Sequence, residues 1–329
     1  MRPFAYRRAD DVDGAVAMLA LNPGAAFLGG GTNLVDHLRL GVTSPDLLVD
    51  VTRLGLDRIE ALPDGGVRVG GTVRNSDLAA DPLIRERYPV LAQALLSGAS
   101  GQLRNLATIG GNLLQRTRCA YFQDVTKPCN KRWPGSGCPA RDGDHRNLAI
   151  LGHSEHCVAT HPSDMAVALA AIGAAVHVRG PGGERTVPIP GLHRLPGDAP
   201  ERDTVLEHGD LITAVEVPGL PWATRSRYRK VRDRASFAFA VVSVAAALDV
   251  DDAGGTVRDA RLALGGVAHV PWRALAAEDV LRGAPATRES FEAAAEAELA
   301  AAEPLRDNAF KVSLAHNLIV RTLLELAEA

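Results

Sequence analysis

The sequence contains no apolar run long enough to cross a membrane and no apolar signal core near its start. The longest apolar stretch, FAFAVVSVAAALDV, falls short of the roughly 20 residues that a membrane-spanning helix needs. Acidic residues in MRPFAYRRADDVDG occupy the place of the apolar core of a signal peptide. We therefore expect no membrane span and a cytoplasmic location from this chain alone. Periplasmic export is expected only together with a partner that carries a signal.

Lysine is also rare, and the sequence has no excess of positive charge. Only four lysines occur among the 36 basic residues, and the formal net charge is -3. A slightly negative net charge does not indicate a nucleic-acid-binding surface or a polybasic patch that binds membranes. Internal repeats and low-complexity segments are also absent. With 329 residues, of which 46% are hydrophobic, the chain is globular and long enough for two or three domains.

Helix and strand patterns divide the chain. Residues 10–24 predict a helix capped by Asp10 or Asp11, and residues 25–51 predict strand, glycine loop, helix and strand. Residues 58–71 predict a β-hairpin that turns at Asp64. The pattern is helical from Ser76 to Ser100, residues 163–180 predict a helix that runs into a strand, and residues 210–219 predict a further strand. Long antiparallel strands and then helices follow near residue 221, which indicates a C-terminal α+β domain.

Two glycine-rich turns are candidate anion sites. LGGGTN (28–33) lies between an expected strand and helix, and TIGGN (108–112) is the second turn. Glycines let backbone N–H groups approach a ligand, and the following helix start adds positive potential. A dinucleotide-binding G-x-G-x-x-G motif is incomplete, because Leu34 occupies its third glycine position. We therefore predict that Asp50, which ends a strand, is structural.

All four cysteines lie within one segment that has little helix or strand pattern. They are Cys119, Cys129, Cys138 and Cys157. Disulfides lack the support of a secretory signal. Zinc lacks its usual close cysteine pairs, although His145, His153, His156 and His161 lie nearby. Single cysteines at wide spacing also suit a [4Fe–4S] cluster, and unligated thiols are the fourth interpretation.

Four motifs together resemble a known family. FLGGGTNLVDHLRLG, LRNLATIGGNLLQRTRC, HPSD and YRKVRDRASFAFA resemble the FAD-binding medium subunit of the molybdenum hydroxylases, the family of xanthine dehydrogenase and carbon monoxide dehydrogenase. The resemblance covers essentially the whole chain. The cysteine segment is similar to that of the flavin subunits of bacterial periplasmic aldehyde oxidoreductases and, more loosely, of the β subunit of 4-hydroxybenzoyl-CoA reductase. This resemblance implies that the four cysteines bind a [4Fe–4S] cluster.

The resemblance also implies an α+β fold of the vanillyl-alcohol-oxidase (PCMH) type. An FAD-binding domain would span 1–220, with an N-terminal α/β subdomain at 1–75 and a second subdomain at 76–220 that carries the iron–sulfur insertion at about 116–160. A C-terminal domain of the carbon monoxide dehydrogenase flavoprotein type would span 221–329. The implied FAD contacts are Phe27, Leu28, Gly29, Gly30, Gly31, Thr32, Asn33, Leu34, Thr108, Gly111, Asn112, Leu114, Asp164, Ile212 and Lys230.

The residues themselves leave two of these contacts open. Asp164 could instead cap the helix that follows it, and Ile212 could be a core residue. Lys230 could stabilise the electron density of a reduced flavin.

The implied function is electron transfer without a substrate-oxidising residue in this chain. A large subunit with molybdopterin would oxidise an aldehyde, and a small subunit with [2Fe–2S] centres would pass the electrons to FAD here. FAD would then pass them to an external acceptor, within a heterotrimer or its dimer. The alternatives are a subunit of a 4-hydroxybenzoyl-CoA reductase-like or xanthine dehydrogenase-like complex, a stand-alone flavin oxidase, and a zinc-stabilised scaffold.

Overall fold

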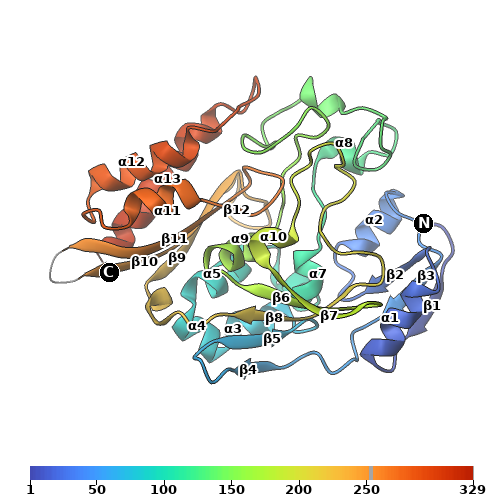
Figure 1. Ribbon diagram of the computed structural model, residues 1–329. Helices are drawn as coiled ribbons and strands as arrows, with labels where there is room; N and C mark the ends of the chain where they lie inside the picture. The colour runs from blue at the N-terminus through green and yellow to red at the C-terminus, as the bar shows by residue number, and fades with distance from the viewer. Residues whose placement is uncertain (252–254, 329) are drawn as a thin grey trace.

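Three β-sheets organise the part of the chain that the structure, a computed structural model, describes, namely residues 1–251 and 255–328. The strand orders are β1-β3-β2, β4-β5-β8-β6-β7 and β12-β11-β10-β9. Figure 1 shows the first sheet beside the N-terminus and the last sheet under the C-terminal helices. The five-stranded sheet lies between them, and the cysteine segment around α8 forms loops at the top of this view.

The first sheet is a small parallel unit. It contains β1 (Ala5–Arg8), β2 (Ala25–Leu28) and β3 (Leu47–Asp50), with α1 (Val12–Ala20) and α2 (Leu34–Leu40). The Asp11 side chain accepts a hydrogen bond from the Gly14 N–H at 2.7 Å, so the predicted cap of the first helix is confirmed. Asn33 occupies the N-cap position of α2 without a side-chain capping bond. The glycine loop thus leads from β2 directly into α2.

The five-stranded sheet is antiparallel. Its strands are β4 (Ile59–Ala61), β5 (Val67–Gly70), β6 (Ala175–Gly180), β7 (Gly183–Pro188) and β8 (Leu211–Val217). Asp64 accepts a hydrogen bond from Gly66 in the turn between β4 and β5, as the hairpin prediction required. The largest apolar core includes residues of this sheet, α5 (Pro89–Ser97) and α9 (Asp164–Ala171).

The helical pattern from Ser76 to Ser100 is divided in the structure. It forms α3 (Asn75–Ala80), α4 (Pro82–Arg87) and α5, and the last two helices each begin with a proline. Proline lacks the N–H that would continue the preceding helix, yet it suits the first position of a new one. The shorter helical elements before β9 are α6 (Gly101–Arg104), α7 (Ile109–Leu113), α8 (Ala120–Gln123), η1 (Pro139–Arg141), α10 (Ile189–Leu192) and η2 (Pro221–Thr224).

The last sheet and three helices form a separate core. The strands are β9 (Ser226–Val231), β10 (Val242–Asp251), β11 (Thr256–Gly265) and β12 (Trp272–Arg273). The helices are α11 (Leu275–Leu281), α12 (Arg288–Leu299) and α13 (Phe310–Ala327). The expected antiparallel pairing of β10 with β11 is present. The segment 232–241, expected to continue a strand, instead lies outside the strands and reaches the site described below.

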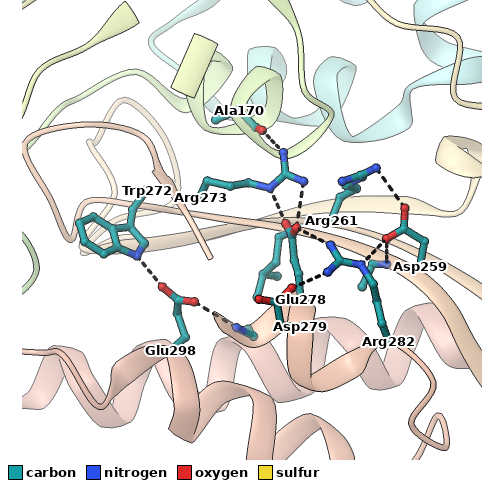
Figure 2. Close-up of polar contacts among 12 residues, drawn as sticks. Ala170, Asp259, Arg261, Trp272, Arg273, Glu278, Asp279, Arg282 and Glu298 are labelled. Carbon is teal, nitrogen blue, oxygen red and sulfur yellow. Dashed lines mark hydrogen bonds and ion pairs between the residues drawn. The ribbon is translucent and has the colours of Figure 1, made fainter. Parts of the chain in front are cut away.

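A buried charge network joins this last sheet to α9 (Figure 2). Glu278 is fully buried and accepts hydrogen bonds from the Arg273 guanidinium and from the Leu262 N–H. Arg273 also donates to the Ala170 carbonyl oxygen at 2.7 Å, in the last turn of α9. A positive charge at this end complements the helix dipole. The C-terminal sheet therefore holds one end of the helix that begins with Asp164.

None of the helices in the described ranges combines the length and the apolar character that a membrane crossing would need.

Candidate functional site

Two adjoining cavities lie beside the two glycine turns. The glycine cavity, of about 280 Å³, is lined by the first glycine loop, by part of the second and by the start of β8. The aspartate cavity, of about 470 Å³, is lined by Asp164, by residues of α5 and by the segment 233–239. Thr32, Asn33 and Gly111 line both cavities. The two cavities thus share part of their wall, and an extended ligand could reach from one into the other.

The structure brings most of the predicted contacts to the glycine cavity. The lining includes Phe27, Gly29, Gly30, Gly31, Thr32, Asn33, Leu34, Thr108, Gly111, Leu114 and Ile212. Leu28 ends β2 and is not among the residues that line either cavity. Ile212 is 4% exposed and belongs to the main apolar core, yet its strand also forms a wall of this cavity. Both interpretations of Ile212 therefore have structural support.

The two glycine loops pack directly against each other. A Cβ atom on Gly30 would lie 1.9 Å from the Leu106 carbonyl oxygen, and one on Gly29 would lie 2.8 Å from the Thr108 hydroxyl. The first atom of any side chain at Gly30 would therefore collide with backbone.

The second loop is held by side chains at both of its ends. Thr108 caps α7, and its hydroxyl oxygen accepts a hydrogen bond from the Gly111 N–H at 3.2 Å. Asn112 lines the aspartate cavity, and its Oδ1 accepts from the Ser163 hydroxyl at 2.6 Å. The N–H groups of Ile109 and Gly110 donate to the carbonyl oxygens of Val73 and Gly71, so the start of α7 is fixed to the neighbouring chain.

Asp164 lies in a buried cluster of polar groups. Its carboxylate accepts hydrogen bonds from the Lys230 ammonium at 2.8 Å and from the Tyr228 hydroxyl at 2.5 Å. Burial raises the pKa of Asp164, while the Lys230 charge acts in the opposite direction. Ser163, and not Asp164, is the N-cap of α9, since its hydroxyl accepts from the Ala166 N–H. The capping interpretation of Asp164 is therefore wrong.

Lys230 lies behind Asp164. Its side chain is 3% exposed, and its ammonium donates to Asp164 and to the Ser97 carbonyl oxygen. Lys230 is not among the residues that line the two cavities. Direct contact with a flavin therefore stays a prediction, and the contact that the structure shows is with Asp164.

Sequence reasoning missed several residues in the wall of the aspartate cavity. Phe237 and Phe239 line it and are about half exposed, and Arg118 lies beside them with its guanidinium 5.0 Å from the Phe239 ring centroid. Phe237 and Ala99, both of the cavity wall, have φ of 51°, an uncommon conformation for residues other than glycine. Phe237 and Phe239 were visible in YRKVRDRASFAFA, but the strand pattern concealed their place in a loop.

Asp50 lies away from both cavities and fixes the end of β3. It accepts hydrogen bonds from the Tyr6 hydroxyl at 2.5 Å and from the Thr52 N–H at 2.8 Å. It is not among the lining residues of the glycine cavity, although Val51 is. The contacts of Asp50 are those of a structural residue.

All four cysteines line one small cavity. Cys119, Cys129, Cys138 and Cys157 are free thiols, and its wall also contains Lys131 and His156. Burial raises the pKa of Cys119 and Cys138 and raises that of Cys157 to about 12. Within the described ranges, no three His, Cys, Asp or Glu side chains are arranged to hold a single metal ion. The four thiols thus converge on one place.

Family models cover almost the entire chain. The model for the FAD binding domain in molybdopterin dehydrogenase matches residues 2–220, and the model for the CO dehydrogenase flavoprotein C-terminal domain matches residues 226–326. The chain belongs to the FAD-binding subunits of the molybdenum hydroxylases. As such a subunit it is part of an oxidoreductase, and the α+β fold that the resemblance implied is confirmed.

Known relatives extend over the full length of this flavin subunit. It is 48% identical over 327 residues to the aldehyde oxidoreductase FAD-binding subunit PaoB of Escherichia coli (strain K12), with 99% of this chain and 98% of that protein covered. It is 29% identical to the carbon monoxide dehydrogenase medium chain of Hydrogenophaga pseudoflava, with 97% and 96% covered. A solved structure of carbon monoxide dehydrogenase from that organism superposes with a TM-score of 0.75 at 29% identity, and the match covers 98% of this chain and 97% of that one.

Proposed function

We propose that this chain is the FAD- and [4Fe–4S]-binding electron-transfer subunit of a molybdenum-containing aldehyde oxidoreductase. The observation that carries the aldehyde assignment is the 48% identity, over nearly the whole chain, to a flavin subunit whose name states that activity. The proposed partners are a large subunit with the molybdenum cofactor and a small subunit with [2Fe–2S] centres. They form a heterotrimer or its dimer with this chain, and an external acceptor takes the electrons.

The two adjoining cavities are the proposed FAD site. The first glycine turn places backbone without side chains along the glycine cavity, which suits the diphosphate, and the aspartate cavity has aromatic and apolar walls that suit a ring system. FAD would supply the exchange of electrons between iron–sulfur centres and the acceptor. This chain's own residues would bind and orient it, with Asp164 at the wall of the ring region and Lys230 holding that carboxylate in place.

The four cysteines are the proposed ligands of the [4Fe–4S] cluster. Their convergence on one cavity supports this assignment, and so does their number, because such clusters take four thiolate ligands. Lys131, also in the cavity wall, lowers the pKa of Cys157 against the effect of burial and would favour its thiolate.

Metal content and a ligand variant test the cluster. The purified complex should contain iron and acid-labile sulfide, and Cys129→Ser should remove about four irons per flavin subunit. Thr126→Ser, at an exposed position of the same segment, is the matched control and should leave the iron content unchanged. Zinc in place of iron, or equal iron in Cys129→Ser and wild type, would exclude the cluster.

Separation of the subunits tests the electron-transfer role. The flavin subunit alone should not oxidise aldehydes with an artificial dye as acceptor, whereas the complex with both partners should. Aldehyde turnover by the isolated chain would favour a stand-alone flavin oxidase instead.

A further inference from the structure

Three histidines, of which His193 and His269 are buried and His161 is partly buried, line a small cavity beside the two cavities of the proposed FAD site. His161 precedes α9, His193 follows α10, and His269 lies between β11 and β12. All three line a cavity of about 10 Å³, together with Leu113 and Asp203. The ring centroids of His161 and His193 are 4.3 Å apart. Segments distant in the sequence therefore place three imidazoles around one water-sized space.

Each ring has one nitrogen whose role is fixed by a backbone group. His193 Nε2 donates to the Leu113 carbonyl oxygen, and His269 Nδ1 donates to the Arg194 carbonyl oxygen, both at 2.9 Å. His161 Nδ1 accepts from the Ser163 N–H at 3.3 Å. A carbonyl oxygen only accepts and an amide N–H only donates, so these contacts set the tautomer of each neutral ring.

The remaining nitrogens are buried and have no hydrogen-bond partner among the described residues. They are His161 Nε2, His193 Nδ1 and His269 Nε2. From the tautomers, His161 presents one N–H donor, and His193 and His269 present one acceptor each. A water molecule offers the complementary set, since its oxygen accepts one hydrogen bond while its two hydrogens are donated. Buried waters typically make about three hydrogen bonds.

A metal ion does not fit the same set. A metal needs an unprotonated nitrogen from every ligand, and the Ser163 N–H leaves the proton of His161 on Nε2. The absence of a metal-holding group of side chains among the described residues agrees with this reasoning.

We propose that His161, His193 and His269 bind one internal water molecule and, through it, hold the second glycine loop in its flavin-binding position. His193 reaches that loop directly at Leu113, the last residue of α7. His161 reaches it through Ser163, whose N–H donates to the ring and whose hydroxyl donates to Asn112. The three histidines are thus positioning residues for a loop that lines both cavities of the FAD site.

The surroundings of the histidines favour their neutral forms. Burial lowers the pKa of His161 and His193 and lowers that of His269 to about 4. Asp203 faces all three rings and raises their pKa, whereas Lys131 lowers that of His269. Asp203 is itself paired with Lys131 and Arg116. The negative charge nearest to the rings is therefore neutralised by other partners.

Nitrogen NMR of the full chain, labelled with ¹⁵N-histidine, tests the tautomers. Protons are expected on Nε2 of His161, on Nε2 of His193 and on Nδ1 of His269, with no change between pH 8 and pH 5.5. A crystal structure at about 1.2 Å resolution should show one water within hydrogen-bond distance of the three free nitrogens. A dry cavity, anomalous scattering from a metal, or a proton on Nδ1 of His161 would overturn the proposal.

Flavin binding tests the positioning role. His269→Leu removes one acceptor of the water, and FAD should then bind roughly tenfold more weakly. His269→Gln supplies an amide oxygen and an N–H group and should restore most of the affinity. His316→Gln, on α13, is the control and should bind FAD as the wild type does. Equal FAD affinity in the leucine and glutamine variants would contradict the role, and circular dichroism checks that both fold. These outcomes depend on FAD binding alone and not on the proposed cluster or partners.

Discussion

Replacement of Lys230 by methionine isolates the buried ion pair next to the proposed FAD site. Lys230 and Asp164 are 3% and 8% exposed, and their charged groups are 2.8 Å apart. Methionine retains most of the apolar stem of lysine, so the main loss is the ammonium and its hydrogen bonds. Removal of one partner from a buried ion pair destabilises proteins by about 3–5 kcal/mol, because the other charge remains buried without compensation.

The loss of stability in Lys230→Met should depend on pH. Burial already raises the pKa of Asp164, and loss of the lysine raises it further. A carboxyl group whose pKa is higher in the folded than in the unfolded state reduces stability as the pH rises above the unfolded value. We therefore expect a loss of about 3 kcal/mol at pH 8 and a smaller loss at pH 5, where Asp164 takes up a proton and Tyr228 still binds it.

Urea unfolding of the purified subunit at pH 5 and pH 8 measures this difference. The double variant Lys230→Met/Asp164→Asn carries no buried charge at this place, so the pH-dependent part of the loss should disappear. Lys127→Met, at an exposed position, should change the free energy of unfolding by no more than about 0.5 kcal/mol. An equal loss at both pH values in the single variant would refute the reasoning, because it would mean that Asp164 does not carry the effect.

Three further predictions follow from single residues. Gly30→Ala should lower stability and FAD content together, because its Cβ would lie 1.9 Å from a backbone oxygen. Urea unfolding and flavin absorbance measure the two effects, and an apo-protein of wild-type stability would contradict the prediction. Asp50→Asn should leave FAD content unchanged and lower stability by about 1–2 kcal/mol, since the lost hydrogen bonds are to a charged group. Loss of flavin at full stability would instead favour a dinucleotide-binding motif. Burial, together with the positive charges of Arg116 and Arg118, lowers the pKa of His37 to about 4. The folded state therefore favours neutral His37, and the stability that this preference gives is lost as the pH falls from 6.5 toward 4. Acidification from pH 7 to pH 5 should therefore destabilise the wild type by about 2 kcal/mol more than His37→Gln, and equal losses would exclude this role.

Local patterns predicted the helices and strands well where one segment determines its own structure. The cap at Asp11, the hairpin turn at Asp64 and the last helix depend on neighbouring residues, and each is present. The Ser76–Ser100 pattern predicted helix correctly but not its division, although Pro82 and Pro89 were visible in the sequence.

Features of the site that depend on distant segments could not be read from the pattern. Gly30 is restricted by a carbonyl oxygen 76 residues away in the chain, at Leu106. The aromatic wall at Phe237 depends on a loop where residue alternation indicated a strand. The prediction that the cysteines share one cluster came from the family resemblance, because their spacing alone also allowed zinc and unligated thiols.

The contacts at the two ends of α9 have a consequence for the synthesis of the chain. Asp164 at its start is held by Tyr228 and Lys230, and Ala170 in its last turn is held by Arg273. All three partners emerge from the ribosome after the helix itself. A nascent chain that has reached only residue 220 therefore has the glycine loops but lacks the groups that fix the Asp164 carboxylate. We therefore expect the chain to bind flavin stably only after the C-terminal sheet has been synthesised and has packed against α9.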